Sequence, residues 1–384
     1  MVSAVFDHIV AILVVGAVFV SAVVVLPMVS FGNLQAVDQQ QLRNTALNVF
    51  NTILLDTGRP TNWGALPNFT MNDPRVQRFG LANAEDSRFF VLDPDKVQKL
   101  VIGNPLNFCE YNSVRSLLGL QGYGFMLKII PPFNVTFLNV PYVVGNVLHY
   151  SVKVTYLTGD PIPNALSDAT AVYTKKVGDE EFFNVTESTP VLSNVMGIAH
   201  GSVTLAYSEP EYFMVTVRVT VADVATLVVM SGNAYENSIA NINLVYDTMI
   251  LTRVEEDQPK DNVWIYNIIA FDSEGSLWSL YDGNKDQESK LNSGQGEFEF
   301  WRKTFYGLHG FNPVLLIFNF WAVDPLTGNG RSQILVVMAY PNLLTTNIFQ
   351  YGGSPSIGKT SVAVQRSVMI SGMTYTAELW LWKE

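Results

Sequence analysis

An uninterrupted apolar run opens this chain. Residues 9–31 carry no charged side chain, and at about 1.5 Å of helix per residue such a run crosses a hydrocarbon layer of about 30 Å. A secretory signal would show a basic start, a shorter apolar stretch and a small-residue cleavage site, and none is clear here. The pattern therefore predicts a retained membrane helix, with Asp7 and His8 at its polar entry and Pro27 near its end.

Beyond this run the apolar residues follow the spacing of an amphipathic helix. Gly58 favours the left-handed conformation that ends a helix, and Pro60 cannot continue the turn. We therefore expect one long helix over residues 1–56. The apolar stripe of its second part is Leu42, Ala46, Val49, Phe50, Ile53 and Leu54.

Most of the remaining chain alternates between apolar and polar residues. Residues 148–156 and 213–221 have the period of two that is typical of half-buried strands. Turn sequences at Gly159-Asp160-Pro161 and Gly178-Asp179 lie between them. Short strands at this spacing predict an Ig-like or prealbumin-like β-sandwich over residues 144–227.

The segments on either side of this sandwich are expected to form two further modules. Residues 57–143 combine short helices near 93–100 and 111–120 with short strands, which indicates an α+β head module. Residues 228–384 are predicted to be β-rich and are a candidate for completing that head. The expected strands are 264–270, 314–321, 333–338, 361–370 and 375–382, the last two joined by a hairpin at Ser371-Gly372. The fold class is therefore mainly β, and α+β overall.

Composition excludes several classes of function. A net charge of −11 without any basic run argues against a nucleic-acid partner. The single cysteine, Cys109, excludes an internal disulfide framework, and four scattered histidines give no metal cage. With 48% apolar residues, the chain must be stabilised by packing. We expect no cofactor.

Three N-glycosylation sequons begin at Asn68, Asn134 and Asn184. Neither flank of the apolar run carries the Lys or Arg that would orient a membrane helix. Because sequons are used outside the cytoplasm, they favour a single-pass protein of the cell membrane with its C-terminal bulk extracytoplasmic.

One phosphate-loop pattern, G-x-x-x-x-G-K-[ST], matches residues 353–360. Nucleotide binding requires a helix directly after the loop, so that backbone amides face the phosphates. The following residues alternate as a strand, which favours a hairpin loop instead.

A second pattern resembles the first half of a calcium loop. Asp282, Asn284 and Asp286 place oxygen ligands at alternate positions. Gln287 replaces the Gly of the sharp turn, however, and Ser293 replaces the closing Glu, so a solvated polar turn is the favoured interpretation.

Nucleophilic catalysis has no sequence support. There is no G-x-S-x-G elbow, and no histidine lies near Cys109 in the sequence. His149, His200 and His309 are isolated from one another. We therefore expect a protein that is not an enzyme.

Four short motifs follow one another along the N-terminal third of the chain. They are Gly58-Arg59-Pro60-Thr61-Asn62-Trp63, Gly80-Leu81-Ala82, Leu92-Asp93-Pro94-Asp95-Lys96 and Leu118-Gly119-Leu120. With these motifs, this part of the chain resembles a group of archaeal pilin-like surface proteins of unassigned role. The resemblance covers about residues 1–130, with a weaker match at Val364-Gln365-Arg366. The resemblance implies a membrane-anchored head with an inserted sandwich. Residues 1–6 depart from the family, since prepilins carry a basic residue before the apolar helix.

Three functions are consistent with these features. The leading hypothesis is an archaeal pilin-like structural or adhesion protein, a filament subunit that binds membrane lipid and copies of itself or other pilin-like subunits. The alternative is a monomeric tethered ectodomain that binds a ligand or serves the envelope. An extracytoplasmic hydrolase or receptor is the third, because β scaffolds can hold sites that no motif reveals.

Overall fold

The structure of the protein is a computed structural model. We describe residues 14–15, 18–19, 38–66, 71, 73–101, 109–177, 180–232, 240–253, 263–283, 290–291, 300–323, 331–341, 348–355 and 359–384. Strands dominate these residues, which confirms the mainly β class. Among the described helices, none is both long enough and apolar enough to cross a membrane. Asp7 and most of the predicted span at 9–31 lie outside the described residues.

A helix over residues 38–55 leads into the head and buries its apolar stripe there. Phe50 and Ile53 are fully buried, whereas Asn48 and Thr52 are exposed. The helix ends where the sequence predicts, because Gly58 has a φ of +76° and its amide donates to the Asp56 carboxylate at 2.8 Å. The stripe thus packs on the protein's own head.

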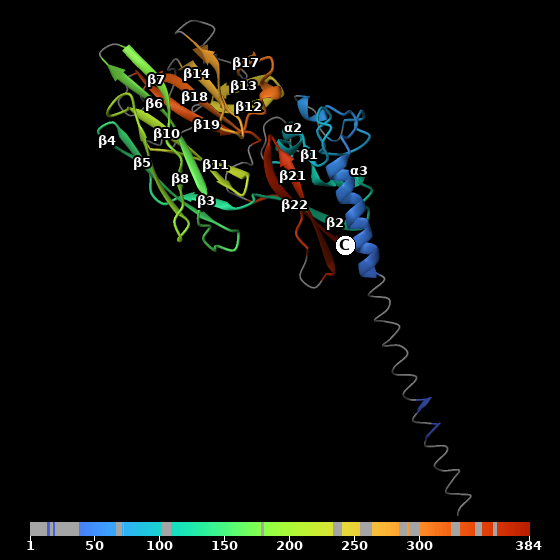
Figure 1. The fold of residues 1–384 in the computed structure, drawn as a ribbon. Helices are drawn as coiled ribbons and strands as arrows, with labels where there is room; N and C mark the ends of the chain where they lie inside the picture. The colour runs from blue at the N-terminus through green and yellow to red at the C-terminus, as the bar shows by residue number, and fades with distance from the viewer. Residues whose placement is uncertain are drawn as a thin grey trace, which may run out of the picture.

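The head contains one five-stranded sheet covered by helices (Figure 1). Its helical elements are η1 (Trp63–Ala65), α2 (Pro94–Gln98) and α3 (Tyr111–Leu117). Its strands, in sheet order, are β1 (Val91–Leu92), β21 (Ser361–Ile370), β22 (Met373–Lys383), β2 (Tyr123–Ile130) and β20 (Phe349–Gly352). Strands from the two ends of the chain therefore share one sheet.

The predicted C-terminal hairpin is present. β21 and β22 pair antiparallel as far as Ile370 and Met373. The two residues between them, Ser371 and Gly372, have φ angles of +47° and +78°, as a tight hairpin turn with matching twist requires. The short helices predicted near 93–100 and 111–120 are confirmed as α2 and α3, each shorter than expected.

The inserted segment forms two sheets that share a core, here called the sandwich. The first contains β3 (Asn134–Phe137), β4 (Tyr142–Val144), β5 (Val147–Thr155) and β9 (Ile198–Thr204). The second contains β6 (Leu166–Val177), β7 (Glu180–Glu187), β8 (Val191–Leu192), β10 (Tyr212–Val221) and β11 (Val224–Ser231). Both alternating segments of the sequence are strands, β5 and β10. Their inward residues, such as Val152 and Val217, are fully buried.

Two further sheets, here called the distal sheets, follow the sandwich. One contains β12 (Ala240–Val245), β13 (Thr248–Arg253) and β17 (Phe300–Thr304). The other contains β14 (Val263–Phe271), β15 (Leu277–Asp282), β16 (Lys290–Leu291), β18 (Leu315–Val323) and β19 (Arg331–Ala339), and α4 (Leu308–Phe311) lies beside them. The strands predicted at 264–270, 314–321 and 333–338 correspond to β14, β18 and β19.

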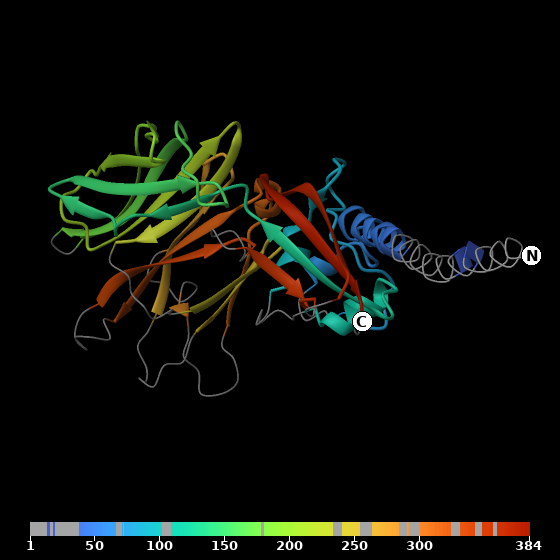
Figure 2. The ribbon, with the colours of Figure 1, turned by 90° about the horizontal axis from the view of Figure 1, so that it is seen from below.

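The sandwich and the distal sheets stack into layers (Figure 2). The β6–β10 sheet contributes one face to the sandwich core and its other face to the core of the head. The β14–β18 sheet likewise faces both the head core and the distal core. The residues that extend the head core between these sheets include Val172, Met214, Leu227, Ile269, Ile317 and Leu335. Because the β6–β10 and β14–β18 sheets are buried on both faces, the head, the sandwich and the distal sheets pack against one another.

The Phe50→Ala variant should test how firmly the helix is docked. Phe50 is fully buried in the head core, and a large-to-small change at such a site costs about 3–5 kcal/mol of unfolding free energy. Asn48→Ala, on the exposed side of the same helix, should change it by less than about 0.5 kcal/mol. Chemical unfolding of the full chain measures both values. Equal effects would show that the stripe does not hold the helix.

Candidate functional site

The charged helix α2 is buried throughout. Asp93 caps it, because its carboxylate accepts hydrogen bonds from the amides of Asp95 at 2.9 Å and Lys96 at 3.4 Å. All five helical residues, from Pro94 to Gln98, are buried. Buried charges must be paired or hydrogen-bonded, so each charged side chain here needs specific acceptors or donors.

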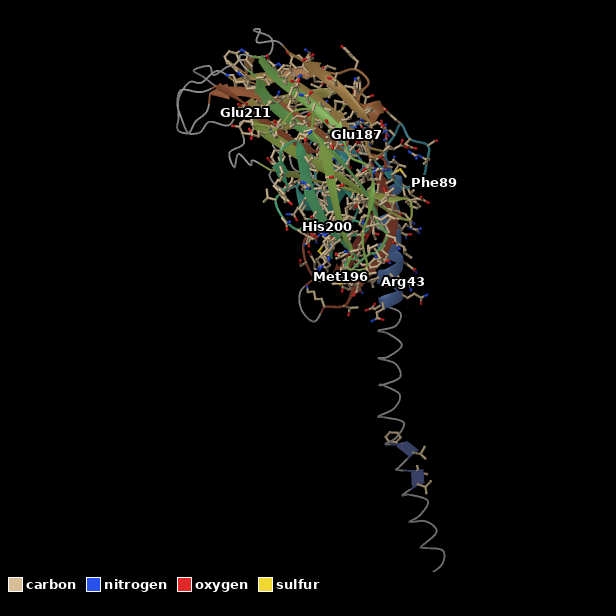
Figure 3. The ribbon with its side chains drawn as sticks, turned by 60° about the vertical axis from the view of Figure 1, so that its left-hand side comes forward. Arg43, Phe89, Glu187, Met196, His200 and Glu211 are labelled. Atoms are coloured by element: carbon tan, nitrogen blue, oxygen red, sulfur yellow. The ribbon has the colours of Figure 1, made fainter. Side chains whose placement is uncertain are left out.

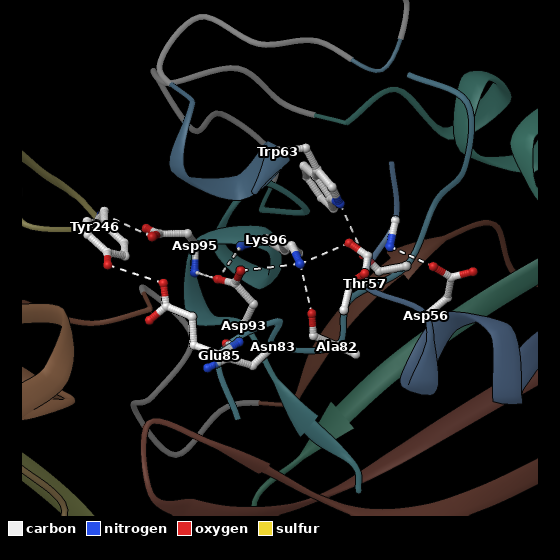
Figure 4. Close-up of polar contacts among 12 residues, drawn as sticks. Asp56, Thr57, Trp63, Ala82, Asn83, Glu85, Asp93, Asp95, Lys96 and Tyr246 are labelled. Carbon is white, nitrogen blue, oxygen red and sulfur yellow. Dashed lines mark hydrogen bonds and ion pairs between the residues drawn. The ribbon is translucent and has the colours of Figure 1, made fainter. Parts of the chain in front are cut away.

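Lys96 finds its acceptors on segments distant in sequence. Its ammonium donates to the carbonyl of Thr57 at 3.0 Å and to that of Ala82 at 2.7 Å, and it lies 3.4 Å from the Asp93 carboxylate. Figure 4 shows these contacts converging on the Nζ atom. The Lys96 side chain is fully buried, and this burial lowers the pKa of its ammonium. Lys96 therefore joins α2 to the end of the N-terminal helix.

Trp63 packs beside this lysine in a tightly built corner. Its indole nitrogen donates to the carbonyl of Gly80 at 3.1 Å. A Cβ at Gly80 would lie 2.0 Å from the Asp56 carbonyl oxygen, and one at Gly64 would lie 2.7 Å from the Lys96 side chain. Only glycine fits at either position. The first three motifs that carry the family resemblance thus meet in one place.

Asp95 connects α2 to the distal sheets. Its carboxylate accepts hydrogen bonds from the Tyr340 hydroxyl at 2.7 Å, the Tyr246 amide at 3.0 Å and the Gln98 side chain at 2.9 Å. Gln98 also donates to the Leu244 carbonyl at 2.8 Å. Burial, and next the charge of Asp93, raises the pKa of the Asp95 carboxyl to about 7.

A cleft of about 360 Å³ opens beside this junction. Tyr246, in the turn between β12 and β13, lines it with a φ of +55°, an uncommon conformation for a bulky residue. The Tyr246 hydroxyl donates to Glu85 at 3.2 Å, and its ring stacks on His309 at 4.4 Å. Glu85 also lies 3.7 Å from the His309 ring. The tyrosine ring is therefore held from two sides.

The predicted glycosylation sites differ in accessibility. Asn134 is half-buried at the start of β3, and Thr136 of its sequon is exposed. Asn184 pairs with Tyr173, whose side chain is buried in the sandwich core, and the Asn184 Nδ2 atom is buried without a hydrogen bond. Asn68 lies outside the described residues.

The calcium candidate is described in part. Asp282 ends β15, and its carboxylate accepts a hydrogen bond from Asn267 at 3.0 Å. Asn284 and Asp286 lie outside the described residues. In the part of the chain that the structure describes, no group of three His, Cys, Asp or Glu residues could hold a metal ion.

The remaining motifs lie apart from the cleft. Where the phosphate-loop pattern ends, at Thr360, the strand β21 follows instead of a helix. His149 stacks on Tyr142, and His200 bonds Ser151 on an exposed surface. Burial raises the pKa of the Cys109 thiol to about 12, so little thiolate exists near neutral pH. His309 alone among these residues lies beside the cleft.

Comparison with known proteins identifies no family. No family model matches the chain, and no curated protein matches it. A trypsin-activated alpha-2-macroglobulin from Escherichia coli is similar with a TM-score of 0.22 and 11% identity, over 61% of this chain and 19% of that one. A Ca²⁺-stabilised ice-binding adhesin of an Antarctic bacterium has a TM-score of 0.15 and 11% identity, over 55% and 49%. This chain spans less than two thirds of the length of either protein. Structural similarity this weak does not indicate a function.

The buried Asp95 should make stability depend on pH. Its pKa is about 7 in the folded protein against 3.8 ordinarily, so the folded state binds the proton more tightly between these values. The stabilisation from Asp95 is therefore present below about pH 4 and is lost as the pH rises through about 7. The Asp95→Asn side chain cannot ionise. Between these pH values, the free energy of unfolding in urea should therefore fall less for this variant than for the wild type. An unchanged pH slope would contradict the assignment.

We expect a glycan on Asn134 and none on Asn184. Asn134→Gln should remove one glycan from the protein produced by its own cells, as mass spectrometry of the intact chain would show. Asn184→Gln should leave the glycan mass unchanged, because a glycan on that buried Nδ2 atom would have to lie in the sandwich core. A glycan found on Asn184 would overturn its placement.

Proposed function

We propose that this chain is a membrane-anchored, pilin-like structural or adhesion protein of an archaeal cell surface. In this proposal residues 9–31 form a transmembrane helix that binds lipid, and the β-rich head with its Ig-like sandwich is displayed outside the cell. The observation that carries the proposal is the uncharged run at 9–31 of the sequence, which is followed six residues later by a helix at 38–55 that is docked on the head by its buried stripe.

The exposed apolar residues near the N-terminus support an anchor. Val14, Val15, Val18 and Phe19 are 55–69% exposed, and their segments lie apart from the head (Figure 1). Apolar side chains clustered in this way need an apolar environment outside the protein's own core. A run of this length suits a bilayer.

The helix at 38–55 helps to distinguish a monomeric tethered ectodomain from a filament subunit. Its apolar stripe is already covered by the head, and its outer surface presents polar residues such as Arg43, which projects outward in Figure 3. Bundling through that stripe is therefore unavailable to a second copy. This observation favours the tethered ectodomain, and a filament would need its subunits to pack through residues 9–31.

Immunogold electron microscopy of intact cells tests the proposal and separates the two forms. Antibodies raised against residues 57–384 should label scattered points over the envelope for a tether and extended lines for a filament. A chain lacking residues 9–31 should lose its attachment to the membrane fraction, whereas Arg43→Ala should keep it. Labelling only after permeabilisation, or attachment without residues 9–31, would overturn the proposal.

A further inference from the structure

The cleft beside Tyr246 has a floor made by one face of a distal sheet. Ile250 lies opposite Arg302 in the β13–β17 pairing, and Thr248 lies on the same face. Met249 and Leu251, the two neighbours of Ile250 in β13, point the other way, into the distal core. Because neighbouring strand residues alternate between faces, an aliphatic, a hydroxyl and a guanidinium group are displayed together toward the cleft.

The walls of the cleft come from the head. Asn62 and Ala65 belong to the turn around η1, and Glu85 lies across from the β12–β13 hairpin. The amide of Glu85 donates to the Asn83 side chain at 2.9 Å, and its carboxylate accepts from Tyr246. Hydrogen bonds therefore fix the carboxylate and the aromatic ring before any ligand arrives, which reduces the entropy lost on binding.

We infer that this cleft binds a neutral saccharide. Its lining offers an amide from Asn62, a carboxylate from Glu85 and a guanidinium from Arg302, and planar groups of these kinds can each engage a pair of neighbouring hydroxyls. Ile250 and the Tyr246 ring supply apolar surface between them. A sugar ring combines hydroxyl edges with apolar C–H faces, so it matches both kinds of surface.

The volume of the cleft and the charge of its lining restrict the class of ligand further. A cleft of about 360 Å³ is at the small end of the roughly 300–1,000 Å³ typical of ligand sites, and it lies at a module junction, where such sites are frequent. Among the described residues, one carboxylate, from Glu85, and one guanidinium, from Arg302, line the cleft, so their formal charges cancel. A neutral mono- or disaccharide unit is therefore favoured over an anionic ligand. This inference rests on the proposed surface location of the head.

Isothermal titration of the full chain in lipid nanodiscs tests the inference. The probes are the methyl glycosides of glucose, galactose, mannose and N-acetylglucosamine, with glucuronic acid as an acidic comparison. At least one neutral glycoside should bind. Asn62→Ala and Arg302→Ala should each weaken that binding about tenfold or more, since each removes hydrogen bonds to the ligand. Arg43 is exposed and is not among the residues that line the cleft, so Arg43→Ala should leave the binding unchanged.

Three results would overturn the inference. They are no binding of any neutral glycoside, binding only of glucuronic acid, and binding that neither Asn62→Ala nor Arg302→Ala weakens. Both residues are exposed, so thermal unfolding midpoints should match the wild type and confirm that the variants are folded. Membrane attachment is measured separately on the same nanodisc sample, so a failure of the anchor and a failure of sugar binding are distinguishable.

Discussion

The assembly of the head depends on the contacts of the buried Lys96 ammonium. A lysine that is fully removed from water is stable only when its charge is met by specific acceptors. Here the acceptors are the carbonyls of Thr57 and Ala82 and the carboxylate of Asp93. They lie on three separate segments, so the end of the N-terminal helix, the Gly80–Ala82 segment and α2 must assemble together.

The same short helix, α2, is also hydrogen-bonded to the distal sheets. Asp95, next to Lys96 in sequence, accepts hydrogen bonds from Tyr246 and Tyr340. One side of α2 thus contacts the end of the helix at 38–55, and another contacts the β12–β13 hairpin that lines the cleft. These contacts fix the orientation of the cleft relative to that helix.

Local patterns predicted local elements well, and they failed where contacts join distant residues. The alternation in β5 and β10, the stripe around Phe50 and the hairpin turn at Gly372 all follow from periodicity and turn chemistry. The Asp95–Tyr340 bond joins residues 245 positions apart, and no pattern within a window reveals it. The Asp93–Lys96 motif was visible as part of a resemblance, but no local pattern shows that the surrounding fold buries its charges. The cleft was missed for the same reason, since Asn62, Glu85 and Arg302 come from separate segments.

Native-state hydrogen exchange on Lys96→Met tests the central role of this lysine most directly. Methionine fills a similar volume but leaves two carbonyls and the Asp93 carboxylate buried without their cation. We predict a loss of about 3–5 kcal/mol in the free energy of unfolding, together with faster exchange of the amides between Leu42 and Leu54. Unchanged protection of that helix would contradict the account, because the helix would then be held by its apolar stripe alone.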